Sequence, residues 1–360
     1  MIIFLLIFPL GIILALPLLG IIVSGSDAAF YLEFPPKPVI TSHAPFSWPV
    51  LIVICLFVLM VTLPFVRQGL KWKRIEPPSA AGRFPWWGYG SVGALVLFWI
   101  LAWTRLHGFA PFQHHTFFPL WFCWIVCVNA LTFRRSGRCP MIDSPIRFTG
   151  LFAVSALFWW MFEYLNRFVG NWYYTGSEYP AVTYFLLATL SFSTVLPAVE
   201  SMKTYLMTHD TFKNGFQNMP RIQGLDSKPA AVCILVISFL CLGLIGILPD
   251  PLFFTLWISP FFLLLGFRIL CNHPHVFGGV KGGDYTMVVS YAFAALICGI
   301  FWEMFNFYSL ARWQYTIPYV QVCHLFEMPI LGYSGYLPFG LECALVIDLV
   351  QQATDRAGSI

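Results

Sequence analysis

The sequence predicts an all-α polytopic membrane protein of about ten transmembrane helices, built as two leading helices followed by a tandem parallel repeat of two four-helix units. The first observation behind this prediction is the composition, since only 10% of the residues are charged and 59% are hydrophobic, whereas a soluble domain carries about 25% charged residues. The second is the mean hydropathy of +0.76, with apolar runs that reach the roughly 20 residues of a membrane span. The third is an ordered internal repeat.

Ten apolar runs define the predicted helices: 1–23, 48–66, 88–104, 116–133, 148–168, 183–202, 230–248, 252–270, 286–307 and roughly 326–350. We expect the first to be an uncleaved helix instead of a signal peptide, because no basic segment precedes it. Pro329 and Pro338 interrupt the tenth. The chain then divides into two leading helices (1–66, with outer loop 24–47), a cytoplasmic linker (67–87), a first four-helix unit (88–205), a second cytoplasmic linker (206–229), a second four-helix unit (230–352) and a cytoplasmic tail (353–360).

Five short motifs of the first unit recur in the second, in the same order and offset by 136 to 141 residues. They are Gly108-x-x-Pro111 with Gly246-x-x-Pro249, Phe117-Phe118-x-Leu120-Trp121 with Phe253-Phe254-x-Leu256-Trp257, Glu163-x-x-Asn166 with Glu303-x-x-Asn306, Trp172-x-Tyr174-Thr175 with Trp313-x-Tyr315-Thr316, and Ser193-x-x-Leu196-Pro197 with Ser334-x-x-Leu337-Pro338. Self-similarity of this kind indicates a duplicated fold. Because each unit has an even number of spans, both copies point the same way, which predicts parallel repeats related by an axis along the membrane normal.

The distribution of Lys and Arg predicts the orientation. Of the 20 basic residues, 16 lie in one set of loops and helix ends. The other four are Lys37, Arg105, Arg167 and Arg312. The positive-inside rule therefore predicts a multi-pass protein of the cell (inner) membrane with both termini in the cytoplasm. The net charge of +4 reflects this topology and not a nucleic-acid partner, because the charges form no single basic stripe. Glu200 and Asp348 are expected at solvated helix ends.

Carboxylates inside the apolar spans are the candidate catalytic residues. A charged side chain in the hydrocarbon region costs roughly 2.5–3.5 kcal/mol, so we expect Glu163 and Glu303 to face the protein interior beside polar partners. Asn166 and Asn306, at i+3 on the same helix faces, are candidate partners and candidate substrate-binding residues, and outer-side arginines and histidines are further candidate partners. Glu342 is a third intramembrane carboxylate and a third catalytic candidate. The alternative is a structural role as hydrogen-bonding groups between helices.

Aromatic residues follow both carboxylate-bearing helices and are the other candidates for substrate binding. They are Trp172, Tyr174, Trp313 and Tyr315. We expect them at the outer interface, where amphipathic rings are favoured. The outer loops 24–47 and 308–337 are rich in aromatic residues and proline, and we expect them to roof an apolar cavity. Such a cavity favours a membrane lipid or another apolar small molecule as the ligand.

No motif indicates a metal site or a cofactor. All eight histidines fall in loops or at helix ends, so none is placed to ligate a b-type haem. A site that combines outer-side histidines with glutamates has suitable ligand chemistry, but no HxxxH or HxxEH spacing supports it. The ten cysteines contain no CxxC pair, and nothing resembles a P-loop, a dinucleotide fingerprint or a Ser-His-Asp set. We therefore expect neither a metal nor a cofactor.

The duplicated order of a carboxylate-bearing helix, a Trp-x-Tyr element and a Pro-x-x(x)-Glu helix resembles the lycopene-cyclase-type integral membrane proteins of carotenoid biosynthesis. The resemblance covers part of each unit and rests on Glu163, Glu303, Trp172, Trp313 and Glu342. It implies acid–base catalysis by the carboxylates on an isoprenoid. The sequence departs from that family because the paired acidic Glu-Glu element is absent, each unit has four helices, and the spacings are longer.

Three functions remain open on the sequence alone. The first is an enzyme that carries out redox-neutral acid–base chemistry on an isoprenoid or other lipid with its outer-leaflet carboxylates. The second is a proton- or ion-coupled transporter or channel that uses the carboxylates as coupling groups. The third is a non-catalytic lipid- or quinone-binding subunit, which would have protein partners in a larger membrane complex. None of the three involves nucleic acid.

Overall fold

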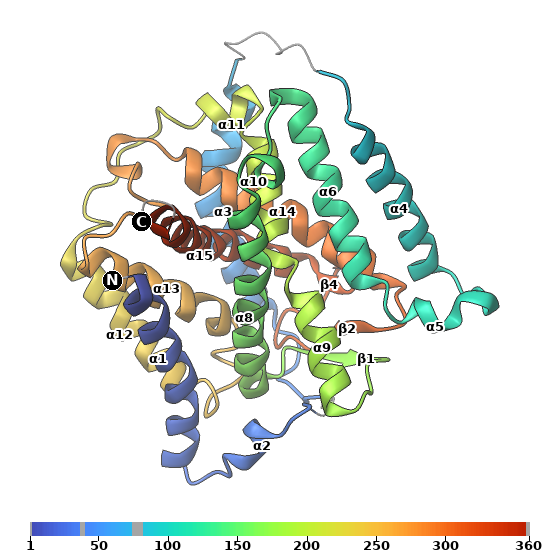
Figure 1. The fold of residues 1–360 in the computed structure, drawn as a ribbon. Coiled ribbons are helices and arrows are strands. Elements are labelled where there is room, and N and C mark those ends of the chain that lie inside the picture. The colour runs from blue at the N-terminus through green and yellow to red at the C-terminus, as the bar shows by residue number, and fades with distance from the viewer. Residues whose placement is uncertain (1, 37–39, 74–81, 358–360) are drawn as a thin grey trace.

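Long helices packed side by side make up most of the protein in the computed structural model, which describes residues 2–36, 40–73 and 82–357 (Figure 1). Among the described residues, eight helical segments are long and apolar enough to cross a membrane. They are Phe4–Val23, Trp48–Lys71, Trp86–Trp103, Phe117–Ser136, Pro145–Val169, Ala181–Leu206, Thr286–Phe307 and Ile330–Asp355. The chain is therefore a multi-pass, membrane-embedded protein of mainly α-helical structure.

The elements follow one another along the chain in the order that Figure 1 labels. The α-helices are α1 (Ile2–Val23), α2 (Ala29–Leu32), α3 (Trp48–Lys71), α4 (Trp86–Trp103), α5 (Ala110–Gln113), α6 (Phe117–Ser136), α7 (Pro140–Asp143), α8 (Pro145–Val169), α9 (Ala181–Phe192), α10 (Val195–Leu206), α11 (Asp210–Asn214), α12 (Lys228–Leu244), α13 (Thr255–Leu270), α14 (Thr286–Phe307) and α15 (Tyr336–Ala357). Short strands are β1 (Trp172–Thr175), β2 (Arg312–Tyr315), β3 (His324–Leu325) and β4 (Met328–Pro329), and 3₁₀ turns are η1 (His107–Phe109), η2 (Val280–Gly282) and η3 (Ile330–Gly335).

The eight segments coincide with eight of the ten predicted spans, with small differences at their ends. The two remaining predictions, 230–248 and 252–270, correspond to α12 and α13, which have only 17 and 16 residues. Helices of this length rise about 24–26 Å, which is short of the roughly 30 Å hydrocarbon thickness. The predicted sixth span is divided at residues 193–194 into α9 and α10.

Prolines mark where two of the helices begin. The tenth predicted span, roughly 326–350, matches the segment Ile330–Asp355, but its α-helix, α15, begins only at Tyr336, because 328–335 form β4 and η3. Pro338 is the third residue of α15, and Pro197 is the third residue of α10. The first N–H groups of a helix have no partner within the helix, so a proline there removes no hydrogen bond. Neither proline therefore breaks its helix.

An aromatic core joins α6 to α14. Trp121 is fully buried, and its ring lies 5.0 Å from that of Trp302 and 5.7 Å from that of Phe305, measured between centroids. Helix α10 packs against both α6 and α14, and α15 packs against α14, α13 and α8. The leading helix α1 packs against α12 and α13. These contacts surround α15 with helices on several sides, which explains why Glu342 in that helix is fully buried.

Glu200, which we expected at a solvated helix end, is engaged inside the protein. It is only 9% exposed, and it accepts hydrogen bonds from Lys203 Nζ at 2.9 Å and from Tyr291 OH at 3.0 Å. That prediction failed because it considered α10 alone, whereas α14 packs against α10. Asp348 keeps 38% of its side chain exposed, as a solvated position requires, and forms an ion pair with Arg268, whose side chain is buried in α13.

We predict that Asp348→Asn will destabilise the protein by about 3 kcal/mol, because a buried guanidinium loses its counter-charge. Asp226, which pairs with Lys281 at 3.3 Å on the surface, is the matched control, since exposed pairs contribute at most about 1 kcal/mol. Thermal unfolding of the purified variants in detergent measures both effects. Equal melting temperatures for Asp348→Asn and Asp226→Asn would contradict the structural role assigned to Arg268.

Candidate functional site

The first carboxylate-bearing helix ends in a turn that positions a strand. Helix α8 stops at Gly170, whose φ of +63° places it in the left-handed region, which glycine adopts at no steric cost. Asn166 then binds the chain that follows, because its Oδ1 accepts the N–H of Asn171 at 2.8 Å and its Nδ2 donates to the carbonyl of Trp172 at 2.7 Å. These bonds fix the start of β1.

The second carboxylate-bearing helix uses the same device. Asn306 accepts the N–H of Trp313 on Oδ1 and donates from Nδ2 to the carbonyl of Trp313, both at 2.9 Å. Both asparagines therefore hold the backbone of the following strand. We had expected them as partners of the glutamates at i−3, and that expectation was wrong because strand backbone occupies the amides. In this geometry Asn166 and Asn306 are positioning residues.

The two strands pair with each other in an antiparallel arrangement. Trp172 lies opposite Tyr315, and Tyr174 lies opposite Trp313. Side chains alternate between the two faces of a strand, and directly opposed residues share a face. All four rings therefore lie on one face, and all four line the same cavity. On the other face Tyr173 OH donates to Gln314 Oε1 at 2.7 Å.

Three aromatic donors converge on Glu163, which is 6% exposed. Its Oε1 accepts hydrogen bonds from Tyr174 OH at 2.6 Å, from Trp159 Nε1 at 3.0 Å and from Trp172 Nε1 at 3.2 Å. Two of the donors come from β1, and Trp159 comes from the preceding turn of α8. The glutamate therefore faces the interior, with aromatic partners in place of the asparagine, arginine or histidine that we had considered.

Glu303 is fully buried and has two phenol donors. Its Oε1 accepts hydrogen bonds from Tyr315 OH at 2.7 Å and from Tyr336 OH at 2.8 Å. Trp313 Nε1 donates to Tyr315 OH at 3.0 Å, which extends the network by one group. Oε2 of Glu303 has no hydrogen-bond partner among the described residues. The second site is thus similar to the first but contains two hydroxyl groups where the first contains one.

A single exchange explains the difference between the two sites. The offset of 140 residues that relates Glu163 to Glu303 also relates Trp159 to Gly299. A Cβ atom on Gly299 would lie 2.3 Å from the ring of Tyr336, so Tyr336 occupies the space that a side chain at 299 would need. At the position equivalent to Tyr336, the first unit has Val195. The donor that does not come from the strand is thus supplied by the carboxylate-bearing helix in one site and by the start of α15 in the other.

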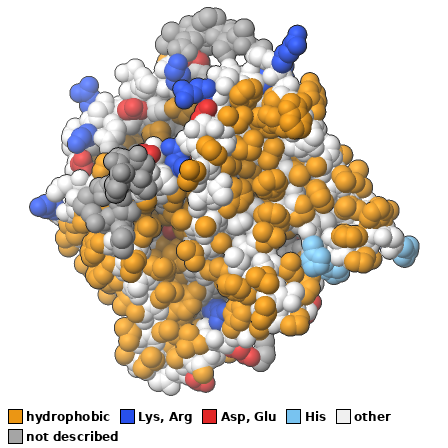
Figure 2. Space-filling model, in the orientation of Figure 1, with side chains coloured by type: hydrophobic (Ala, Val, Ile, Leu, Met, Phe, Trp, Pro, Cys, Tyr) orange, Lys and Arg blue, Asp and Glu red, His pale blue; other side chains and the backbone are white. Residues whose placement is uncertain are grey.

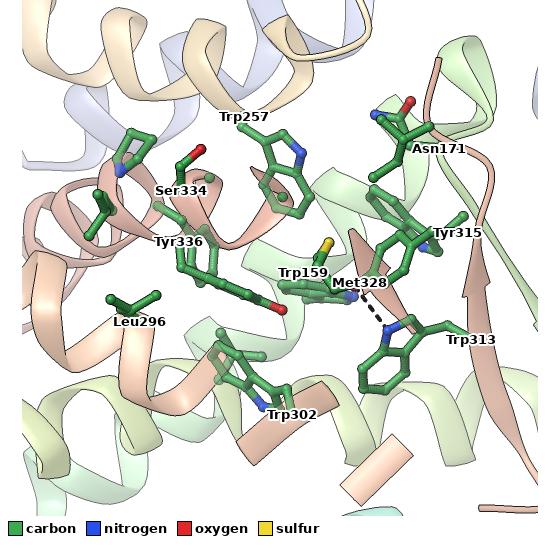
Figure 3. Close-up of a pocket in the computed structure, with 18 of the residues that line it drawn as sticks. Trp159, Asn171, Trp257, Leu296, Trp302, Trp313, Tyr315, Met328, Ser334 and Tyr336 are labelled. Carbon is green, nitrogen blue, oxygen red and sulfur yellow. Dashed lines mark hydrogen bonds between the residues drawn. The ribbon is translucent and has the colours of Figure 1, made fainter. Parts of the chain in front are cut away.

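The cavity beside the strands has a volume of about 1200 Å³ and a mainly aromatic and aliphatic wall. Figure 3 shows Trp159, Trp302, Trp313 and Tyr336 around this space, with the hydroxyl of Tyr336 between Trp302 and Trp159. Ligand pockets usually have volumes of about 300–1,000 Å³, so this cavity is large. Glu163 and Glu303 lie behind the wall, and their donor side chains form part of it.

The outer loops contribute unequally to the cavity. Loop 308–337 supplies Trp313, Tyr315, Val320 and Met328 to the wall, as expected, whereas no described residue of loop 24–47 lines it. The first loop is instead tied to its surroundings, because Ala44 N donates to Asp250 Oδ2 at 2.7 Å. Loop 24–47 therefore connects to a neighbouring segment and does not line the cavity.

Glu342 stands apart from the two carboxylate sites. It is fully buried in α15, neither of its oxygens has a hydrogen-bond partner among the described residues, and it is absent from the cavity wall. The structure therefore brings Glu163 and Glu303 to one cavity but does not bring Glu342 there. Nor does the described part of the chain contain a cluster of three or more His, Cys, Asp or Glu side chains that could hold a metal ion.

Sequence reasoning missed several members of the site, namely Trp159, Trp257, Trp302, Tyr336 and Gly299. Trp159 carried a signal, because it precedes Glu163 by four residues and i, i+4 positions share a helix face. Trp302 is adjacent in sequence to Glu303, so helical periodicity gave no reason to place both at one site. Tyr336 carried no local signal, since its position depends on the packing of α15 against α14.

We predict that Gly299→Ala will displace Tyr336 from Glu303 and lower the thermal stability, because the new methyl group meets the Tyr336 ring. Adding Tyr336→Val, the residue found at the equivalent position of the first unit, will restore much of the loss. A double-mutant cycle should give a coupling within about 0.5–3 kcal/mol. Gly93→Ala in α4 is the control, because no atom lies within 4 Å of its added Cβ. Additive effects of the two changes would contradict the proposed exchange.

The phenols that donate to the carboxylates are held neutral. Burial raises the pKa of Tyr174 and of Tyr315 well above the ordinary value, and the adjacent glutamate raises it further. Because the folded-state pKa lies above the unfolded one, each phenol's contribution to stability is complete below about pH 10 and is lost as the pH rises toward the folded-state pKa. Both groups remain O–H donors at physiological pH.

We predict that Tyr315 will not ionise in the folded protein at pH values near 10, where an ordinary tyrosine is half ionised. The near-ultraviolet difference spectrum between wild type and Tyr315→Phe should show no phenolate until the pH is well above that value. The unfolded proteins provide the control, because there the Tyr315 signal should appear near the ordinary pKa. A phenolate signal from Tyr315 near pH 10 in the folded protein would contradict the burial assigned to it.

Comparison with known proteins gives no relative from which a function could be transferred. No protein-family model, curated protein or solved structure matches this chain. The resemblance to lycopene-cyclase-type membrane proteins therefore remains a prediction from sequence motifs, and the site described above is the basis for assigning a function.

Proposed function

We propose that this protein is a membrane enzyme that performs redox-neutral acid–base chemistry on an isoprenoid or another apolar lipid. The observation that carries the proposal is the pair of buried glutamates, each hydrogen-bonded to tyrosine or tryptophan side chains that line one large apolar cavity. Intramembrane carboxylates are costly and are commonly functional. The tyrosine hydroxyls lie between each carboxylate and the cavity, where they can contact a ligand as well as the glutamate.

The tyrosines provide a route for a proton between glutamate and ligand. A hydroxyl both donates and accepts hydrogen bonds, whereas an indole N–H only donates. In the proposed step, the Tyr336 hydroxyl turns from Glu303 toward the ligand and gives its proton to an alkene carbon, while Glu303, protonated on Oε1, donates its own proton to the Tyr336 oxygen. The alkene π electrons form the new C–H bond, and the adjacent carbon becomes a cation. A neighbouring carbon then loses a proton to the Tyr174 oxygen as Tyr174 passes its own proton to the Glu163 carboxylate, and the C–H electrons re-form a double bond, so no oxidant or reductant is needed.

The wall of the cavity suits a cationic intermediate. The faces of Trp and Tyr rings attract cations through their quadrupole, by about 0.5–2 kcal/mol for each interaction. Trp159, Trp302 and Trp313 surround the end of the cavity where Tyr336 lies (Figure 3). The apolar wall also excludes water, which would otherwise trap the cation. These features support the Glu303 side as the reacting centre, with Glu163 as the second acid–base group.

We also infer the duplicated architecture that the sequence motifs predict, with ten spans and two parallel four-helix units. The matched hydrogen bonds of Asn166 and Asn306 support it, as does the β1–β2 register, in which equivalent residues of the two motifs exchange places about a local two-fold axis. For a two-fold relation between parallel units, the axis would run along the membrane normal.

The inferred location is the cell (inner) membrane, with both termini in the cytoplasm. The division of the 20 basic residues into 16 and four supports this orientation through the positive-inside rule. On the face in Figure 2, Lys and Arg side chains gather in the part that carries α11 and the C-terminus in Figure 1, and hydrophobic side chains cover most of the rest. This asymmetry agrees with a cytoplasmic side at that end.

We predict that the purified protein in phospholipid vesicles will incorporate deuterium from D₂O into carbon positions of linear isoprenoid hydrocarbons or alcohols. Mass spectrometry of the extracted lipids measures this incorporation. Glu303→Gln, which keeps the shape and the hydrogen-bonding capacity of the side chain, should reduce the rate by about 10²–10⁴-fold, with little change in melting temperature. Tyr336→Phe should also reduce it.

Tyr291→Phe is the matched control. Tyr291 also donates from a buried phenol to a buried glutamate, Glu200, but does not line the cavity. Its substitution should leave deuterium incorporation unchanged. A Glu303→Gln variant as active as wild type would rule out the assigned role, and a wild-type protein that binds isoprenoids without incorporating deuterium would favour a non-catalytic lipid-binding subunit.

A further inference from the structure

Helix α3 is fastened at its ends and stands away from the other helices between them. None of its side chains is buried. At one end the N–H of Ser47, directly before α3, donates to the carbonyl of Tyr319 at 2.9 Å. At the other end Gln68 Nε2 donates to the carbonyl of Gly215 at 2.8 Å, and Trp72 Nε1 donates to Asp210 Oδ2 at 3.0 Å. The middle of α3 therefore does not rest on a neighbouring helix but forms one side of the cavity.

One continuous stripe of α3 faces that cavity. It consists of Val53, Ile54, Phe57, Val58, Val61, Thr62, Phe65 and Val66. The spacing of i, i+1, i+4 and i+5 places these residues on a single helix face. At a rise of 1.5 Å per residue the stripe is about 20 Å long, which is far longer than the carboxylate sites alone require.

Two other helices present matching stripes to the same cavity. On α13 and just before it they are Phe254, Trp257, Ile258, Phe261 and Phe262, and on α14 they are Val288, Val289, Ala292, Phe293 and Leu296. Further along α14, Trp302 belongs to the wall near Tyr336, so this wall extends over about 20 Å as well. These three helix faces, together with residues of α9 and the start of α15, line an elongated cavity, here called the channel, with the tyrosine hydroxyls toward one end.

The other end of the channel is apolar. Phe65 packs against a cluster of buried residues that includes Phe216, Tyr285 and Val288, and its ring centroid lies 5.5 Å from that of Tyr285. The channel wall there is formed by aliphatic and aromatic side chains. A polar headgroup placed at this end would lose its water without gaining hydrogen bonds, at a cost of several kcal/mol. The part of a ligand that reaches this end must therefore be a hydrocarbon.

We propose that the channel binds one extended apolar chain, with its far end against Phe65 and Val288, and that the α3 stripe determines which chain lengths are accepted. The reacting end of the chain lies at Tyr336, which rests on the proposed function, whereas binding and length selection follow from the channel itself. Residues midway along the stripe, such as Val58, are specificity-determining because they control whether the chain can extend past them.

Binding of radiolabelled linear isoprenoid hydrocarbons of increasing length, to protein in phospholipid vesicles, tests this proposal without requiring turnover. Wild-type affinity should rise with chain length and stop rising once the chain fills about 20 Å. Val58→Trp should weaken binding of the long chains by about tenfold or more, through the apolar area that they no longer bury, and should leave the shortest chain unaffected. Leu56→Trp, which lies in α3 but outside the cavity wall, is the matched control and should behave as wild type.

Two results would overturn the proposal. The first is a Val58→Trp variant with the same dependence on chain length as wild type. The second is a wild-type protein in which excess phospholipid displaces the labelled chains regardless of their length, because the channel would then be filled by ordinary bilayer acyl chains. Length-dependent binding without deuterium incorporation would leave the channel in place and refute only the acid–base function, so the two failures are distinguishable.

Discussion

A carboxylate buried among aromatic rings needs hydrogen-bond donors, and the arrangement of the whole site depends on how they are supplied. Here most of the donors come from the two four-residue strands that follow the carboxylate-bearing helices. Each strand is held in place by the asparagine one turn after the glutamate. The side-chain amide of that asparagine forms hydrogen bonds with backbone N–H and C=O groups at the strand. A glutamate, its asparagine and its strand therefore form one unit, in which no member can be moved without loosening the others.

Both glutamates are buried and accept hydrogen bonds, but the two sites supply different donor groups. Around Glu163 the donor from outside the strand is the indole of Trp159, and around Glu303 it is the phenol of Tyr336. The exchange depends on a glycine at position 299, whose missing side chain leaves room for the phenol ring. The two glutamates are therefore alike in their strand donors but differ in the remaining donor, an indole that can only donate a hydrogen bond in one site and a hydroxyl that can also accept one in the other.

Local sequence patterns were sufficient for the helices but not for the site. The long apolar runs predicted ten spans, and eight of them match segments long and apolar enough to cross a membrane, because hydrophobicity over about 20 residues is a property of each segment alone. The Trp-x-Tyr elements were recognised, but their pairing was not, since a four-residue strand carries no signal for a partner 140 residues away. Glu200 was misplaced for a related reason, because its burial depends on α14. Contacts between segments that are far apart in the sequence could not be predicted from local sequence patterns.

The antiparallel pairing of β1 with β2 also has a consequence for biogenesis. When the ribosome has produced only the first half of the chain, β1 has emerged but β2 has not, so the backbone N–H and C=O groups of residues 172–175 lack their final partners. Unpaired backbone groups are costly near a bilayer, and the apolar channel cannot yet be enclosed, because α13, α14 and α15 are still missing. The pocket is therefore among the last parts of the molecule to be completed. A chain that ends before residue 312 would leave β1 with an unpaired edge, because all of its strand partners lie in 312–315.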